Sequence, residues 1–435
     1  MKCLAIDIGS TSVKGAALDV QRGCVNEPVT TAFPAPLSGL PAGWVEVDPQ
    51  AVCDAVAKVL AKLVEAAPEA ERLYCAGQMA GLVLIDDAGR PLSNYISWRD
   101  QRTLAEATPG HSFLDSIRSR LEVAGLFGGL GGELHSGSTT ALLAWLREHD
   151  RLPLGAIPTN IADFVVGRLI GKPIPMHVTQ AVGMLDLANS RWHRDAFATL
   201  GLGNQRLPLL SHTEEAVGTI ALAGHSLQVF GSYGDQQCAL RGAGLQPDEL
   251  SLNVSTGSQV SRRVTAFRPG RFLTRKYFFS DYLNTVTHLP AGRSLNVLVD
   301  LLTELARHEG IALRDPWKVI HEQAQAIEAT DLDVDLAFFR GPLGSRGQIA
   351  DITTENLTVG HLFHASFRAM ADNYQQVAGW LGPADWTAVV LSGGLTQSAP
   401  LLRRFLEQRF AVPLRESAGE ETLLGLLDIA RTTVP

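Results

Sequence analysis

The chain has 435 residues, 46% of them hydrophobic and 19% charged, so it is long enough for two or three domains and too apolar for wholesale disorder. Its 45 acidic residues outnumber 37 lysines and arginines, and the net charge of -8 argues against nucleic acid or an anionic membrane surface as the main partner. The five cysteines are scattered without a C-x-x-C pair, which argues against a disulfide framework or a zinc site.

Targeting signals are the next feature of the sequence. No apolar run approaches the roughly 18 residues of a membrane span, and Asp7 interrupts the first apolar run too early for a signal peptide. Scattered, unpaired cysteines fit a reducing compartment. We therefore expect a soluble, cytoplasmic protein.

The first predicted elements form a hairpin. Residues 4–8 are an apolar run, 9–12 are polar turn residues, and 13–18 resume the apolar pattern, so two antiparallel strands are predicted. A helix is predicted from Asp48-Pro49, because a capping side chain precedes a proline and apolar residues then recur at helical spacing. Another helix is predicted after Ser138.

Further along the chain, residues 363–381 carry apolar side chains at steps of four and three, which predicts the clearest amphipathic helix. A strand is predicted at 387–391 and helices at 398–410 and 420–431. Gly425 lies inside the last of these helices, where glycine costs about 1 kcal/mol relative to alanine, so we expect a neighbour packed closely against it.

A glycine-rich segment spans residues 125–137. It lacks the G-K-[ST] ending of a phosphate-binding P-loop, so the sequence predicts a mobile surface loop here.

One sequence pattern occurs in two distant parts of the chain, as an internal echo. The strand-turn-strand pattern of residues 6–18, with its hydroxyl-rich turn, recurs at 252–264. The echo suggests two similar domains that face each other across a cleft, where ligands commonly bind. Since turns rich in serine, threonine and glycine are common, coincidence is the competing interpretation.

The first turn carries the residues for binding phosphate. Gly9 allows the backbone to approach an anion, hydroxyls at Ser10, Thr11 and Ser12 point donors at it, and Lys14 neutralises charge. Asp7 at the strand end is the type of ligand that a hydrated Mg²⁺ takes. An ordinary hairpin turn with a surface lysine is the alternative.

These residues open an ordered series of segments that resembles the FGGY carbohydrate kinases, members of the actin–hexokinase–Hsp70 superfamily. The segments are 5–14, 43–49 (G-W-V-E-V-D-P), 77–81 (G-Q-M-A-G), 98–102 (W-R-D-Q-R), Asp163, 231–237 (G-S-Y-G-D-Q-Q), 255–258 (S-T-G-S), 392–394 (S-G-G) and 420–425 (E-E-T-L-L-G). Together they span nearly the whole chain. The resemblance implies an α/β fold of two ribonuclease-H-like (actin-like ATPase) domains, at 1–244 and 245–435. Each is expected to be a mixed five-stranded sheet flanked by helices, with a cleft between the domains.

The resemblance also implies roles for single residues. A sugar hydroxyl is a poor nucleophile, so a carboxylate must take its proton as it attacks the γ-phosphoryl group of ATP, and Asp235 is the expected base. Asp7 is expected to bind Mg²⁺. The expected ATP-binding residues are Ser10, Thr11, Ser12, Lys14, Thr256, Gly257, Gly393, Gly394 and Gln397, and the expected sugar-binding residues are Gln78, Met79, Trp98, Asp100, Arg102, Asp163 and Gln236.

Two of these assignments have structural alternatives. Asp235 lies in a glycine-flanked turn, where an Asx-turn or a helix cap is the ordinary role of an aspartate. Asp100 and Arg102 stand two apart beside Trp98, so on an extended segment they can bind sugar hydroxyls or pair with each other.

The expected function is transfer of phosphate from ATP to a terminal primary hydroxyl of a ketose. Ala80 replaces the histidine usual in G-Q-M-H-G, which removes a polar contact, while Ser255-Thr256-Gly257-Ser258-Gln259 resembles the S-T-S-x-Q of sedoheptulose kinases. Sedoheptulose is therefore the favoured substrate, with a xylulose/ribulose-type or polyol kinase as the alternative. A non-catalytic, nucleotide-dependent sugar sensor is the alternative of another class. We expect sugar and ATP as the partners, and a monomer or homodimer.

Overall fold

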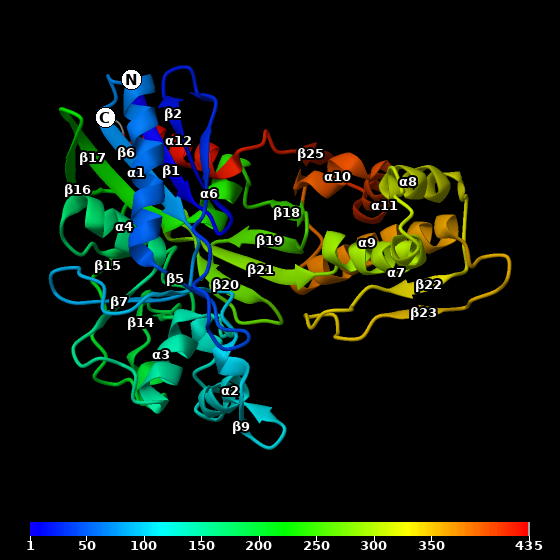
Figure 1. Cartoon of the computed structure of the whole chain (residues 1–435), viewed down its shortest axis with the longest axis horizontal. Helices are drawn as coiled ribbons and strands as arrows, with labels where there is room; N and C mark the ends of the chain where they lie inside the picture. Colours follow the sequence, from blue (N-terminus) through cyan, green and yellow to red (C-terminus); the bar gives the residue numbers. More distant parts are fainter. Residues whose placement is uncertain (434–435) are drawn as a thin grey trace.

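The structure, a computed structural model, describes residues 1–433 and contains two large mixed sheets that lie in separate lobes (Figure 1). Within this range no helix combines the length and the apolar character needed to cross a membrane. The α/β fold with two sheet-containing domains confirms the predicted fold class.

The first sheet is built around the predicted N-terminal hairpin. Its strand order is β16-β17-β6-β1-β2-β3, and β4 also pairs with β2. The strands are β1 (Lys2–Ile8), β2 (Ser12–Asp19), β3 (Cys24–Val25), β4 (Val29–Ala32), β6 (Arg72–Gly77), β16 (Ala216–Leu222) and β17 (His225–Gly234). β1 runs antiparallel to β2 and parallel to β6.

Side chains of β1 alternate between the two faces of this sheet. Leu4, Ile6 and Ile8 join the core under α1 (Pro49–Ala66) and α4 (Ile161–Ile170). Cys3 and Ala5 join the core under α6 (Asp235–Gly242) and α12 (Glu421–Thr433). Because strand side chains alternate, Asp7 lies on the same face as Ala5, the face on which α6 begins.

Short elements between β6 and β16 form a compact region below the first sheet in Figure 1, with its own hydrophobic core. Its helices are α2 (Phe113–Val123), α3 (Thr139–Glu148) and α5 (Arg194–Thr199). Its short strands, together with β5 from before α1, are β5 (Glu46–Val47), β7 (Val83–Ile85), β8 (Tyr95–Ile96), β9 (Glu106–Thr108), β10 (His111–Ser112), β11 (Ile157–Thr159), β12 (Met176–His177), β13 (Leu185–Asp186), β14 (Arg191–Trp192) and β15 (Leu210–Ser211).

The second sheet repeats the central arrangement of the first. Its order is β20-β21-β19-β18-β24-β25, with β18 antiparallel to β19 and parallel to β24. The strands are β18 (Glu249–Val254), β19 (Ser258–Val264), β20 (Leu273–Lys276), β21 (Tyr282–Leu289), β24 (Ala388–Ser392) and β25 (Leu414–Glu416). The hairpin β18–β19 thus occupies the place of β1–β2, as the sequence echo predicted.

Helices cover this second sheet in the right half of Figure 1. They are α7 (Gly292–His308), α8 (Pro316–Ala326), α9 (Val359–Trp380), α10 (Gly394–Ser398) and α11 (Pro400–Phe410), and a small hairpin joins β22 (Asp333–Asp335) to β23 (Gln348–Ala350). Phe363, Phe367, Met370 and Tyr374 of α9 are fully buried in one core, as the amphipathic spacing predicted.

The sheets hold more strands than the five predicted for each: seven in the first and six in the second. The additional strands include β4 and β16, whose side chains are mostly half-buried or exposed. Such edge strands carry little of the apolar pattern that identifies a buried strand, so the sequence did not reveal them.

The last helix returns to the first lobe. α12 packs on α6 so closely that a Cβ at Gly425 would lie 2.0 Å from the carbonyl oxygen of Cys238. A Cβ at Gly242 would lie 1.9 Å from the carbonyl oxygen of Glu421. The close neighbour predicted for Gly425 is thus confirmed. The boundary at 244/245 stays a prediction, to which the structure adds that residues 421–433 belong spatially with the first sheet.

Candidate active site

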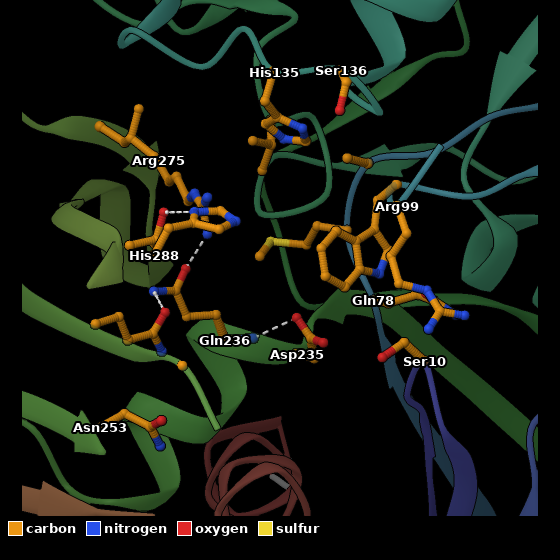
Figure 2. A pocket seen from close by; sticks show the side chains of 18 of the residues that line it. Ser10, Gln78, Arg99, His135, Ser136, Asp235, Gln236, Asn253, Arg275 and His288 are labelled. Atoms are coloured by element: carbon orange, nitrogen blue, oxygen red, sulfur yellow. Dashed lines mark hydrogen bonds between the residues drawn. The ribbon is translucent and has the colours of Figure 1, made fainter. Parts of the chain in front are cut away.

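A cavity of about 960 Å³ opens between the two lobes. Figure 2 shows side chains from both lobes that converge on it. The sequence-predicted residues on its wall are Asp7, Ser10, Gln78, Met79, Trp98, Asp235, Gln236 and Gly257. The structure therefore brings together residues that are up to 250 positions apart in the chain, counted from Asp7 to Gly257.

Asp235 is the first residue of α6 and follows directly on β17. Its side chain lines the cavity and accepts a hydrogen bond of 2.7 Å from the backbone N–H of Gln236 (Figure 2). Burial raises the pKa of Asp235 to about 6, against the opposing effect of that backbone N–H and of the positive Arg275. The carboxylate therefore combines a contact with the backbone of the first turn of α6 and access to the cavity, and its proton affinity is close to that needed near neutral pH.

Asp7 stands at the end of β1, beside Asp235. Burial and then the charge of Asp235 raise the pKa of Asp7 to about 7. Its Oδ1 atom is buried and has no hydrogen-bond partner among the described residues. An unpartnered carboxylate oxygen that faces a second acid is suited to a cation.

Magnesium fits this donor set. In residues 1–433 no three or more His, Cys, Asp or Glu side chains cluster in a way that would hold a metal ion. Mg²⁺ does not need such a cage, because it keeps several waters and is held by one or two carboxylates together with substrate phosphates. Asp7 can supply one such carboxylate.

The turn at residues 9–12 only partly faces the cavity. Ser10 lines it, whereas Thr11, Ser12 and Lys14 do not. The Lys14 Nζ lies 3.0 Å from both carboxylate oxygens of Glu420, just before α12. In this structure Lys14 is thus paired with the last helix rather than directed at a phosphate position.

The turn at residues 255–258 and the turn at residues 392–394 lie side by side. Gly257 lines the cavity and Thr256 stands beside it outside the wall. Asn253 donates a 2.8 Å hydrogen bond from Nδ2 to Ser392 Oγ. Gly393 has φ +89°, and a Cβ there would lie 2.3 Å from the carbonyl oxygen of Val254. Gly394 and Gln397 follow in α10, exposed and outside the cavity wall.

The predicted sugar-binding residues divide into two groups. Gln78, Met79, Trp98 and Gln236 line the cavity. The Gln78 side chain is held by its 3.3 Å hydrogen bond to the carbonyl oxygen of Gly9 and by the 3.2 Å bond that it accepts from the hydroxyl of Tyr95.

Asp100 and Arg102 adopt the alternative arrangement, a structural ion pair. The Arg102 Nε lies 2.8 Å from Asp100 Oδ1, and both side chains are almost fully buried away from the cavity wall. Arg102 also bonds Glu46 at 2.7 Å and lies 4.0 Å from the ring centroid of Trp44. The tryptophans that pack on Arg102 are therefore Trp44 and Trp145, whereas Trp98 faces the cavity.

Asp163 also lies elsewhere. It is buried in the first turn of α4, bonded by Asn160, and borders a second cavity of about 330 Å³. Burial raises the pKa of Asp163 to about 8. The structure does not bring this residue to the cavity between the lobes.

Comparison with known proteins places the chain in a family. The N-terminal domain of the FGGY family of carbohydrate kinases matches residues 2–242, more than half of the sequence. The chain belongs to the FGGY family. The resemblance drawn from the sequence motifs is therefore confirmed, and the Gly9–Ser12 and Gly231–Gln237 segments lie within the matched FGGY domain.

Individual FGGY relatives are distant. A xylulose kinase of Staphylococcus epidermidis is 26% identical over 71% of this chain, and the match spans 63% of its own length. The sedoheptulokinase of Mus musculus is 23% identical over 94% of this chain and 93% of its own length. Among solved structures, a xylulose kinase from Rhodospirillum rubrum has a TM-score of 0.82 at 20% identity, covering 99% of this chain and 90% of that chain. A gluconate kinase from Lactobacillus acidophilus has a TM-score of 0.83 at 18% identity, covering 99% of this chain and 89% of that chain.

The glycine-rich segment 125–137 supplies cavity residues that the sequence analysis missed. Predicted to be a mobile surface loop, it is instead docked between the lobes. The backbone N–H of Thr274 donates to the carbonyl oxygen of Gly131 at 2.8 Å, and a Cβ at Gly137 would lie 1.9 Å from the carbonyl oxygen of Trp98. Gly131 and Gly137 allow the backbone to approach its neighbours closely. The absence of a G-K-[ST] ending excluded a P-loop but gave no information on such packing. His135 and Ser136 of this segment line the cavity.

Basic residues on the cavity wall were also missed. The wall includes Arg99, Arg118, Arg275, His288 and Arg293. An isolated arginine or histidine leaves no recognisable pattern in a sequence, because only the fold shows that these residues line the same cavity. Burial lowers the pKa of His135 to about 4, so that this ring is neutral near pH 7.

Proposed function

We propose that this FGGY protein is an ATP-dependent kinase that phosphorylates a terminal primary hydroxyl of a ketose. The observation that carries the proposal is the position of Asp235. Its carboxylate lines the same cavity as Ser10 and Gln78 (Figure 2). Gly257 of the 255–258 turn and Trp98 line this cavity too. A base placed between two phosphate-binding turns and a polar sugar wall is the arrangement that phosphoryl transfer needs.

In the proposed reaction Asp235 accepts the proton of the sugar hydroxyl. The hydroxyl oxygen forms a bond to the γ-phosphorus as the bond from that phosphorus to the β-bridging oxygen breaks, and ADP leaves with the bonding electrons. Asp235 has the required proton affinity because burial raises its pKa to about 6. At neutral pH most of this carboxylate is therefore ionised and ready to accept the proton.

Other residues bind and orient the reactants. Ser10 and Gly257 present hydrogen-bond donors to the phosphates. Gly393 brings the backbone of the 392–394 turn close to β18. Gln78 and Trp98 hold the sugar. Asp7 would hold Mg²⁺, which when bound neutralises phosphate charge. Lys14 can contact a phosphate only if its ion pair with Glu420 breaks.

Sedoheptulose is the sugar that we favour. Two observations support it: the Ser255–Gln259 motif, and the similarity to a sedoheptulokinase along 94% of this chain. A xylulose-type substrate is the alternative, supported by 26% identity to a xylulose kinase over 71% of the chain. Ala80 on the cavity wall leaves extra room for a longer sugar.

The test is a panel of ketoses and polyols of five to seven carbons, each incubated with ATP and Mg²⁺ while ADP is measured. We expect one ketose to accelerate ADP formation strongly, and Asp235→Asn to reduce this turnover by about 10³-fold or more while ATP still binds. Asp195→Asn, an exposed aspartate of α5, is the matched control and should retain full activity.

Two results would contradict the proposal. Near-normal turnover by Asp235→Asn would exclude this residue as the base. Sugar binding without ADP formation for every compound of the panel would favour the alternative of a sugar sensor.

A further inference from the structure

Arg275 joins three segments that are far apart in the sequence. It lies on β20, an edge strand of the second sheet, and its Nε donates to Glu133 of the glycine-rich segment. Its Nη1 donates to the side-chain oxygen of Gln236, next to Asp235 (Figure 2). The Arg275 guanidinium therefore connects the second sheet to two parts of the first lobe, which are the glycine-rich segment and the first turn of α6.

The ion pair between Arg275 and Glu133 is protected from water. The Glu133 side chain is fully buried and that of Arg275 is 11% exposed. The second carboxylate oxygen of Glu133 has no partner among the described residues. In such surroundings a charge is poorly screened and acts strongly on its neighbours.

Gln236 is held on both sides of its amide. Its oxygen accepts from Arg275, while its nitrogen faces Gln259, Ser261 and Thr285 of the second sheet at 3.3–3.5 Å. The backbone N–H of the same residue donates to Asp235. The orientation of the Gln236 side chain is thus linked to the residue that carries the base.

We propose that Arg275 is a positioning residue for phosphoryl transfer, which fixes Gln236 beside Asp235 by holding its side-chain amide. The inference rests on the proposed function. The interaction crosses between the lobes, so the arrangement around Asp235 depends on the docking of the glycine-rich segment against β20.

The experiment is a double-mutant cycle on kcat, measured with the accepted ketose at saturating ATP and Mg²⁺. Arg275→Met should lower kcat by about 10-fold or more and leave the KM for ATP near its wild-type value, because the two phosphate-binding turns keep their contacts. In the Asp235→Asn background, Arg275→Met should cause no further loss, because its effect acts through Asp235. Arg275→Lys should recover part of the lost kcat, because its charge remains while the two-sided grip on Glu133 and Gln236 is lost.

Arg263→Met is the matched control. Arg263 lies on the same sheet, pairs with Asp281 at 2.6 Å and does not line the cavity, so Arg263→Met should leave kcat unchanged. A loss of kcat that disappears in the Asp235→Asn background supports the inference. An unchanged kcat for Arg275→Met, or the same loss in both backgrounds, overturns it. If wild-type protein transfers phosphate to no sugar, the proposed function fails and the inference fails with it; a wild type that transfers phosphate with unmoved variants refutes the inference alone.

Discussion

Asp163 and Asp235 show how burial assigns different roles to the same side chain. Asp163 is buried and Asp235 is half-buried, and desolvation raises the pKa values of both, to about 8 and about 6. Asp235 lines the cavity between the lobes, while Asp163 borders the separate cavity next to α4. Arg275 opposes the effect of burial at Asp235, whereas no cation contributes to the shift at Asp163. Asp163 is therefore mostly protonated at neutral pH.

This difference predicts the effect of Asp163→Asn on stability. Because the folded-state pKa of Asp163 is raised above its unfolded value, its contribution to stability is complete below the unfolded pKa near 4 and is lost as pH rises toward about 8. We expect Asp163→Asn to raise the free energy of unfolding by roughly 2 kcal/mol at pH 8 and to change it little near pH 4. Urea unfolding at the two pH values measures this.

The same variant also tests the predicted contact with sugar. If Asp163 binds the substrate, Asp163→Asn should raise the KM for the sugar. An unchanged KM together with the stability gain would leave this aspartate a structural role only.

Which site residues could be predicted from the sequence depends on their local setting. Asp7, Ser10 and Asp235 stand at or just after the end of a strand, and such positions are marked by the change from apolar to polar residues. Asp100 and Arg102 were expected on an extended segment. The chain instead turns there, because the backbone N–H of Arg102 donates to Asp100 Oδ1 at 2.9 Å and a short 3-10 helix begins at Arg102. Spacing alone did not show this turn.

At the scale of elements, the contact between α6 and α12 depends on the absence of side chains. Gly425→Ala would place a Cβ 2.0 Å from the carbonyl oxygen of Cys238, so the two helices must separate. We expect a loss of roughly 2–4 kcal/mol in the free energy of unfolding. Gly379→Ala is the control, since it lies in α9 with nothing within 4 Å and should stabilise slightly through helix propensity.

Thermal unfolding of both variants measures the contrast. Equal effects of Gly425→Ala and Gly379→Ala would show that the contact with α6 is not tight in solution. Because α6 begins with Asp235, separation of the helices should also reduce turnover.

Long elements were predicted better than the segments between them. α1 and α9 follow from a capping residue and a regular apolar stripe, and both begin within a few residues of their predicted positions. The docked position of segment 125–137 did not follow, because Trp98 lies 39 residues from its partner Gly137 and Thr274 lies 143 residues from its partner Gly131. Contacts over such separations leave no periodic pattern in a single chain.

At the scale of the whole molecule, the two lobes are joined through α12 as well as through the connection that follows α6. Removal of residues 419–433 should therefore destabilise the first lobe, whose β1 and β6 lose the cover of Leu426 and Ile429. We expect faster hydrogen exchange at β1 and β6 and little change at β18 and β24. Mass spectrometry of peptides from the two sheets measures this, and equal protection of both sheets would contradict it.

The return of α12 also bears on how the protein is made. A ribosome releases residues 1–244 long before it has synthesised α12, so the nascent first lobe lacks one of its covering helices while the second lobe is being built. The second lobe, whose core among the described residues is formed by residues 250–414, can complete itself first. The half that is synthesised earlier is therefore the half that finishes folding later, and until then it exposes a face that chaperones would recognise.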